Sequence, residues 1–397
     1  MTKTEAAKAF LELAAQLRHE GLLAKESGPV KAALRLEDGA AVVAELDGAD
    51  ITIQELGAAP EGEPFLRAFL IKPEAKALLL LRGTYAPRIA DAMRALRAEL
   101  DDMAQIVGLT ARVARALEPR ELARCLRGRN SCFVREHGML ITGRSLTEAL
   151  TGAILLEKAA MTHILAQKIG GAKRVPLFSA ALMHLIYQKK YSKINLGAES
   201  AREQTAQAGE AEGGPVRTER EQTLREQIVA CGRRLVEEGL VQGTWGNLAV
   251  RLDDAYMLCT PSGLDYRYLT PDDVVKVELA TLSYGAQRKP TSEKRLHRDL
   301  FTARNDVGAA IHTHAKLCGV FAAARKSISG GTDAALRCAG HALPSTGKLS
   351  RVAIQALGER SGCLLMNHGV LCCGADLESA CQTCRAAEEA ARGQLGL

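Results

Sequence analysis

The segment Gly308–Ala315 reads Gly-Ala-Ala-Ile-His-Thr-His-Ala, a short apolar run that ends in a His-x-His pair. The run predicts a buried β-strand, and alternate side chains of a strand lie on the same face, so His312 and His314 would point the same way. Two imidazoles placed like this can bind one divalent cation at about 2.1 Å. For this pair taken alone, two buried histidines without a metal are the alternative.

A metal site of this kind needs a third ligand, and the candidates are His297, His341 and His368. We favour His368, because it lies in a His-Gly turn after a predicted strand, where an imidazole can face back over the sheet. Three histidines and one open position are typical of a catalytic rather than a structural site. His297 follows Glu293 by four residues on one helix face, and we interpret it as a structural partner.

Two turns upstream contain small and polar residues. Gln242–Arg251 includes Gly-Thr-Trp-Gly-Asn, and Cys259–Gly263 reads Cys-Thr-Pro-Ser-Gly. Such turns can present backbone amides and hydroxyl groups to an anion, although a plain turn explains the first of them equally well.

A third polar segment, Lys289–His297, predicts the start of a helix. Thr291 or Ser292 is expected to be the N-cap residue, with Glu293 in the first turn. Acidic residues at this position usually interact with the helix dipole. A glutamate close to three histidines could instead be a fourth ligand or a base.

The length and composition allow two domains of ordinary size. The chain has 397 residues, 47% of them hydrophobic, and a net charge of +6, which suits the attraction of small anions. Aromatic residues make up only 4%, without a basic and aromatic run, so we expect no nucleic-acid partner. We also expect no membrane segment, since no apolar run approaches about 18 residues, and no signal peptide, since the first residues lead into an amphipathic helix with Glu12 and Arg18. The 11 cysteines then predict reduced thiols in the cytoplasm.

An internal repeat divides the chain. Arg129–Gly143 aligns without a gap to Arg360–Gly374, and each copy predicts a strand, a His-Gly turn, a strand and a long helix. We therefore predict two tandem copies of one domain, at 1–196 and 223–397. Residues 197–222, rich in Ala, Glu, Gln and Gly, are predicted to be a linker.

Five motifs of the second copy occur in an order that resembles the class II aldolase/adducin family, which includes fuculose-phosphate aldolase and ribulose-phosphate 4-epimerase. They are Gly-Thr-x-Gly-Asn, Thr-Pro-Ser-Gly, Pro-Thr-Ser-Glu, His-Thr-His and Asn-His-Gly, within residues 224–397. The first copy resembles the family mainly from Arg129 to Gly170. The resemblance implies an α/β fold with two tandem three-layer α/β/α domains, each around a mainly antiparallel sheet.

The resemblance also implies a site. It predicts Zn²⁺, or another divalent metal such as Mn²⁺ or Co²⁺, on His312, His314 and His368, with Glu293 as the acid/base. The substrate phosphate would lie near Gly246, Asn247, Ser262, Gly263, Thr291 and Ser292. Active sites would lie between neighbouring domains of a homo-oligomer, for example a dimer that supplies four domains.

The predicted activity is a lyase that cleaves a phosphorylated ketose by retro-aldol chemistry. The metal acts as a Lewis acid that stabilises the enediolate left by cleavage, and Glu293 moves the proton to or from that carbon. The alternatives are a sugar-phosphate 4-epimerase, a dehydratase or decarboxylase on the same scaffold, and a non-catalytic adducin-like assembly module.

The sequence departs from the aldolase pattern in its proton donor. No tyrosine lies between His314 and His368, and Asp333 stands about where that donor is expected, so Asp333 is a second candidate catalytic residue. An acid at this position resembles the epimerase branch, or other chemistries of the family, more than fuculose-phosphate cleavage.

The first copy departs further, since Gly83 and Tyr85 replace its His-x-His, and we predict no catalytic metal there. We hypothesise that an acid of Asp101-Asp102 reaches a neighbouring second-copy site. In the second copy, Cys372-Cys373 and Cys381-x-x-Cys384 are interpreted as buried structural thiols, because their counterparts in the repeat are mostly apolar.

Overall fold

The computed structural model divides the chain into two compact units. It describes residues 3–23, 28–36, 39–56, 63–187, 217–285, 288–329, 336–339 and 347–397. One unit comprises Met1–Ile164 and Arg174–Leu185, and the other comprises Leu165–Lys173 and Ile186–Leu397. Residues 197–216 of the predicted linker lie outside the described residues. Its last four residues are not linker, because they form the first turn of helix α9.

The N-terminal unit is built on an eight-stranded sheet in the order β3-β2-β1-β4-β8-β7-β6-β5. All neighbouring strands are antiparallel except β6 and β7. The strands are β1 Val30–Arg35, β2 Ala41–Asp47, β3 Asp50–Leu56, β4 Ala77–Leu81, β5 Ala95–Arg97, β6 Thr110–Ala114, β7 Ser131–Val134 and β8 Gly138–Gly143.

Helices of the N-terminal unit bury many of their apolar residues, although Leu70, Leu177 and Phe178 are exposed. They are α1 Lys3–His19, α2 Arg67–Ile71, α3 Ala86–Ala92, α4 Asp101–Ile106, α5 Pro119–Leu126, α6 Leu146–Ala166 and α7 Leu177–Ile186. The segment Leu146–Ile169 is long and apolar enough to span a membrane by length and composition, contrary to the expectation from the sequence. However, 78% of its most apolar window is buried inside the protein, as in a core helix.

The C-terminal unit has a seven-stranded sheet in the order β11-β10-β9-β12-β15-β14-β13, in which only β13 and β14 are parallel. The strands are β9 Gly246–Arg251, β10 Tyr256–Cys259, β11 Val275–Glu278, β12 Ala309–Thr313, β13 Arg337–Ala339, β14 Gly362–Leu365 and β15 Gly369–Gly374. The helices are α9 Glu219–Glu237, α10 Lys294–Ala303, α11 Lys316–Ala324, α12 Gly347–Leu357 and α13 Leu377–Leu395.

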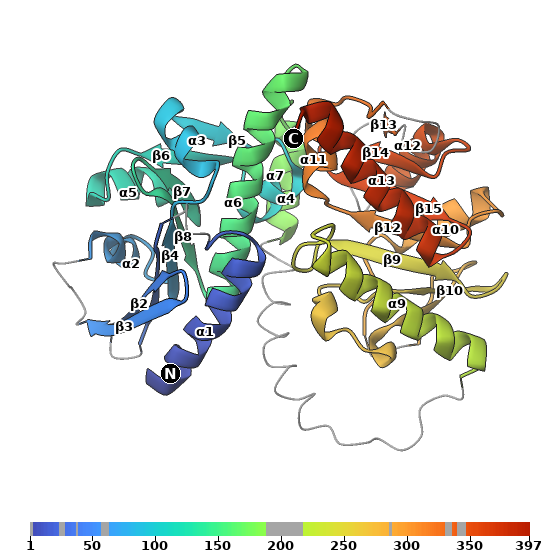
Figure 1. Ribbon diagram of the computed structural model, residues 1–397, viewed down its shortest axis with the longest axis horizontal. Helices are drawn as coiled ribbons and strands as arrows, with labels where there is room; N and C mark the ends of the chain where they lie inside the picture. Colours follow the sequence, from blue (N-terminus) through green and yellow to red (C-terminus); the bar gives the residue numbers. More distant parts are fainter. Residues whose placement is uncertain are drawn as a thin grey trace. The chain divides into compact units, whose positions relative to one another are not determined.

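Helices cover both faces of the second sheet. Leu300 of α10 and Ala353 of α12 share one core with the sheet residues Ala310 and Leu371. Helices α9, α11 and α13 pack together, and α13 lies along β12 and β15 (Figure 1). The predicted three-layer α/β/α domain around a mainly antiparallel sheet is confirmed.

The two units repeat one another in detail. The elements β7, β8 and α6 begin at positions that the sequence alignment matches to the starts of β14, β15 and α13. Glu136 and Asn367, at equivalent positions of the turn, both have a left-handed backbone, with φ of 65° and 61°. Such angles are uncommon outside glycine. The predicted tandem duplication is therefore confirmed by backbone geometry as well as by sequence.

Candidate metal centre

Strand β12 holds two of the predicted ligands at its end. It lies between β9 and β15, and its residues Ala309–Thr313 are all buried, which explains why small apolar residues precede the histidines. The rings of His312 and His314 have centroids 5.0 Å apart, and both side chains are buried. The strand therefore presents both imidazoles on one side, as the alternation of side chains predicts.

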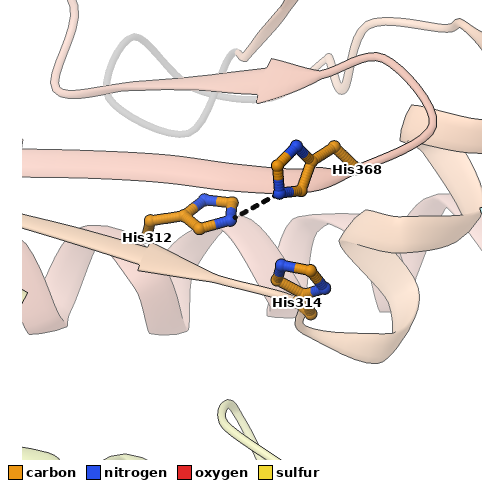
Figure 2. Close-up of side chains that lie close together, drawn as sticks. All are labelled: His312, His314 and His368. Atoms are coloured by element: carbon orange, nitrogen blue, oxygen red, sulfur yellow. Dashed lines mark hydrogen bonds between the residues drawn. The ribbon is translucent and has the colours of Figure 1, made fainter. Parts of the chain in front are cut away.

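The turn between β14 and β15 brings in the third ligand. Gly369 passes so close to β12 that a Cβ atom there would lie 2.3 Å from the carbonyl oxygen of Thr313. This approach places His368 over the end of β12, with its Nε2 3.2 Å from Nε2 of His312 (Figure 2). The ring centroid of His368 lies 4.7 Å from that of His312 and 4.9 Å from that of His314.

The three imidazoles fit a divalent cation. Two nitrogen ligands of a tetrahedral zinc ion lie about 3.3 Å apart, close to the distance between His312 and His368. Nδ1 of His312 lies 3.0 Å from the carbonyl oxygen of Val370, to which it can only donate, so Nε2 of the neutral ring keeps its lone pair. Within the described part of the chain, these are the residues grouped closely enough to hold an ion. His341, the alternative ligand, lies outside the described residues.

Glu293 faces this cluster from the start of α10. It occupies the N-cap position, not the first turn as predicted, and its carboxylate makes no capping hydrogen bond. Its Oε1 lies 3.4 Å from Nε2 of His368, and its Oε2 lies 3.7 Å from Nε2 of His312. Burial raises the pKa of this carboxyl, but the electrostatic effect of the neighbouring His312 and His368 side chains and a hydrogen bond from Asn247 outweigh burial and lower the pKa to about 2. Glu293 is therefore ionised at neutral pH.

A buried side-chain network holds the carboxylate in place. Asn247 lies opposite His312 in the ladder of β9 and β12, and its Nδ2 donates to Oε2 of Glu293 at 3.0 Å. Its Oδ1 accepts a hydrogen bond from Nε2 of His297. Burial lowers the pKa of His297 to about 4, so the ring is neutral at pH 7. The spacing of Glu293 and His297 indicated a shared helix face, but the strand residue that joins them was not predicted.

Asn247 was predicted to bind the substrate phosphate, and the structure gives it these other partners. Only one of its amide hydrogens remains for a ligand, because Glu293 takes the other and His297 occupies the oxygen. Its principal contact in the structure is with Glu293.

The other residues predicted to bind phosphate lie on loops beside this network. The amide of Ser262 donates to the carbonyl of Lys289 at 2.9 Å, and that of Thr291 donates to the carbonyl of Thr260 at 3.0 Å, so two of these loops are joined. Gly246 begins β9 beside them. Ser292 is exposed and Ser262 and Gly263 are half-buried, whereas the buried hydroxyl of Thr291 accepts from the amide of Glu293. Asp333 lies outside the described residues.

The equivalent site of the N-terminal unit keeps only His137 of the three ligands, and the residues that replace the other two differ from the prediction. Leu80 pairs with Leu140 in the ladder of β4 and β8, as His312 pairs with Leu371 in that of β12 and β15. Leu80 and Arg82 therefore replace the two histidines, and the prediction of Gly83 and Tyr85 was wrong by three residues.

The hypothesis that an acid of Asp101-Asp102 reaches a neighbouring second-copy site stays a hypothesis, and Asp102 has another partner in the structure. Its carboxylate pairs with Nζ of Lys158 at 2.8 Å, and both side chains are buried within the N-terminal unit. In the C-terminal unit, Cys372, Cys381 and Cys384 are buried in the core, in agreement with structural thiols.

Comparison with known proteins relates both units to one family. The family described as Class II Aldolase and Adducin N-terminal domain matches residues 12–164 and 226–395. A 5-methylthioribulose-1-phosphate/5-deoxyribulose-1-phosphate aldolase of Rhodospirillum rubrum is 37% identical over 177 residues, which cover 42% of this chain and 78% of that protein. A 5-deoxy-D-ribulose 1-phosphate aldolase of Bacillus thuringiensis is 31% identical, covering 38% and 74%. An L-fuculose phosphate aldolase of Escherichia coli is 33% identical, covering 40% and 75%.

Proposed function

The chain belongs to the class II aldolase and adducin family, and from this premise we propose that its C-terminal unit is a divalent-metal-dependent aldolase that cleaves a ketose 1-phosphate. The observation that supports this most directly is the convergence of three buried imidazoles and one buried carboxylate. A non-catalytic assembly module would have no need of that set. Burial of these four polar side chains costs folding free energy unless a bound ion or a substrate interacts with them.

His312, His314 and His368 are the residues that would hold the metal, which we propose to be Zn²⁺, with Mn²⁺ or Co²⁺ as alternatives. The chemistry supplied by a bound divalent cation is Lewis-acid polarisation of substrate oxygens. The carbonyl of Val370 orients His312, and the close turn at Gly369 positions His368.

Glu293 is proposed to be the acid/base. Retro-aldol cleavage breaks one carbon–carbon bond, leaves an aldehyde, and requires a proton at the carbon that becomes the end of the ketone fragment. The carboxylate of Glu293 is ionised and buried beside the ligand nitrogens, so it is able to accept and return such a proton. Asn247 and His297 are proposed as positioning residues, because Asn247 donates to the carboxylate and His297 donates to Asn247.

The phosphate group is proposed to bind at the loops that carry Gly246, Ser262, Gly263 and Ser292, with the remaining amide hydrogen of Asn247 and the hydroxyl of Thr291 nearby. Hydroxyl groups and backbone amides there can hold it by hydrogen bonds. Two of the relatives named above act on 5-deoxyribulose 1-phosphate, and we propose this type of substrate first and L-fuculose 1-phosphate second. Asp333 remains the predicted replacement for the missing tyrosine donor.

The test is release of dihydroxyacetone phosphate and an aldehyde from each ketose 1-phosphate by the zinc-loaded protein. His368→Ala should abolish release, and His137→Ala provides a matched control, because His137 is the equivalent residue of the N-terminal unit and is exposed. Absence of release from any ketose 1-phosphate, with zinc bound, would refute the proposal. Inversion of one carbon without release would identify a 4-epimerase, loss of water a dehydratase, and loss of carbon dioxide a decarboxylase.

We also propose that the chain forms a homo-oligomer in the cytoplasm, with two chains supplying four domains of the family fold. The duplication supports this arrangement, since one chain already carries two copies. Light scattering checks the assembly, and a monomer at working concentration would contradict it.

A further inference from the structure

A second candidate binding site lies in the N-terminal unit, around α5 and the end of β6. A cavity of about 560 Å³ opens there. It is lined by Arg112, Arg120, Ala123, Arg124, Arg127 and Arg129. Five of its six lining residues therefore carry a positive charge, and none of them belongs to the site described above.

The cavity forms because α5 and β6 are amphipathic, with apolar residues in the core and arginines on the outer side. Helix α5 buries Leu122, Cys125 and Leu126 in the core, so Arg120 and Arg124, four residues apart, share its outer face. Strand β6 buries Ala111 and Val113, and Arg112 between them points to the opposite side. Arg127 and Arg129 follow where the chain leaves α5 for β7.

Three of the guanidinium groups are held by backbone carbonyls. Arg112 donates to the carbonyl of Arg124 at 2.8 Å, and Arg124 donates to that of Val113 at 2.7 Å. Arg129 donates to the carbonyl of Thr110 at 3.0 Å. These hydrogen bonds fix the side chains before any ligand binds, which lowers the entropic cost of binding.

Among the described residues, carboxylates neutralise only part of the positive charge of the cavity. Arg124 pairs with Glu121 at 2.9 Å. In the part of the chain that the structure describes, no carboxylate pairs with Arg112, Arg120, Arg127 or Arg129. Burial and the neighbouring charge of Arg112 both lower the pKa of Arg129. Four unpaired cations around one hollow repel each other, and a multivalent anion would remove that repulsion.

We propose that this cavity binds a compact anion that carries two or more phosphate groups. The planar guanidinium fork matches the geometry of phosphate oxygens, and four unpaired arginines exceed what one monoester requires. The volume is within the range of small-molecule sites, roughly 300 to 1,000 Å³.

A compact ligand fits the cavity better than a nucleic acid. The lining contains no aromatic side chain on which bases could stack. The charges surround one concavity rather than following a long surface. A smaller cavity of about 300 Å³ shares Ala123 and Arg127 with it, but its Lys72 pairs with Glu74 at 2.6 Å and adds no unpaired cation.

The proposal can be tested by calorimetric titration of the full chain with inorganic pyrophosphate. The variant Arg120→Gln/Arg127→Gln is suitable, because both residues are exposed and their side chains make no hydrogen bond with described residues. We expect its dissociation constant for pyrophosphate to rise at least about tenfold, since two charge-assisted contacts are lost. The matched control Lys8→Gln/Arg88→Gln removes two exposed charges elsewhere in the same unit and should bind as the unmodified chain does.

Three results would overturn the proposal. They are no binding of pyrophosphate, equal affinity in the Arg120→Gln/Arg127→Gln variant, and equal weakening in the control. If pyrophosphate bound the C-terminal unit instead, its affinity would not change in the Arg120→Gln/Arg127→Gln variant. Failure of this proposal is therefore distinguishable from failure of the proposed function. Tighter, arginine-dependent binding of a thymidine oligonucleotide would indicate a nucleic-acid surface instead. The variant Arg120→Gln/Arg127→Lys keeps the charge at position 127 and should bind pyrophosphate more tightly than the Arg120→Gln/Arg127→Gln variant. An unchanged unfolding midpoint confirms that each variant folds.

Discussion

The substitution Gly369→Ala tests how the metal centre is assembled without touching a ligand atom. An added Cβ would lie 2.3 Å from the carbonyl oxygen of Thr313 and 3.0 Å from Cε1 of His312. Because a carbon and an oxygen in van der Waals contact lie about 3.3 Å apart, the turn between β14 and β15 must retreat from β12 by roughly 1 Å. His368 is the residue directly before this glycine, and it moves with the turn.

The expected consequence is a large loss of metal affinity with a smaller loss of stability. Overpacking of this kind costs about 1 to 3 kcal/mol of unfolding free energy. A shift of roughly 1 Å removes His368 from the distance at which two ligands share a cation, since metal–nitrogen bonds tolerate only about 0.2 Å. We expect zinc affinity to fall by at least about 100-fold, the upper end of the range for disturbed outer-shell partners.

Gly138→Ala is the matched control. Gly138 is the equivalent residue of the N-terminal unit, where an added Cβ would lie 2.3 Å from the carbonyl oxygen of Arg82, and its φ of 89° adds backbone strain. This variant should lose at least as much stability but keep full zinc affinity. Chelator competition measures affinity, and denaturant titration measures stability. A Gly369→Ala protein that binds zinc as the unmodified chain does would refute the reasoning.

Three further predictions concern the same centre. Glu293→Gln should lower the rate of cleavage about 10²- to 10⁴-fold, the usual contribution of an acid/base, while zinc analysis shows the metal retained; unchanged turnover would exclude that role. Removal of metal by a chelator should lower the thermal unfolding midpoint, and added zinc should raise it again with the logarithm of the free zinc concentration; a midpoint that zinc does not move would argue against the site. The unfolding free energy of the metal-free chain should fall as the pH is lowered from 6.5 to 4, because the depressed pKa of His297 means that the unfolded state binds the proton first. The variant His297→Gln should lack up to roughly 3 kcal/mol of this pH-dependent loss. Identical pH profiles of the variant and the unmodified chain in denaturant titration would refute the prediction.

Features that depend on neighbouring residues in the chain could be predicted from the sequence. The alternation of side chains put His312 and His314 on one face, and the repeat of a strand, a His-Gly turn, a strand and a helix is present in both units. These patterns are local, since a strand has a period of two residues and a turn is set by a few backbone angles. The choice of His368 rested on the resemblance as well as on its turn.

Other features depended on which segments lie side by side. Leu80 and Arg82, rather than Gly83 and Tyr85, were identified by strand pairing as the residues that replace His312 and His314. Register is fixed across strands, and the weak sequence similarity upstream of Arg129 does not determine it.

The sequence by itself determined the duplicated fold and which residue types could bind a metal, because both follow from short segments with a regular spacing of residues. Only the tertiary structure decided that Asn247 joins Glu293 to His297, that Asp102 is occupied by Lys158, and that arginines of α5 and β6 surround one cavity. Each of these depends on side chains from separate elements meeting within a few ångströms. Packing of the whole unit, not local preference, sets those distances.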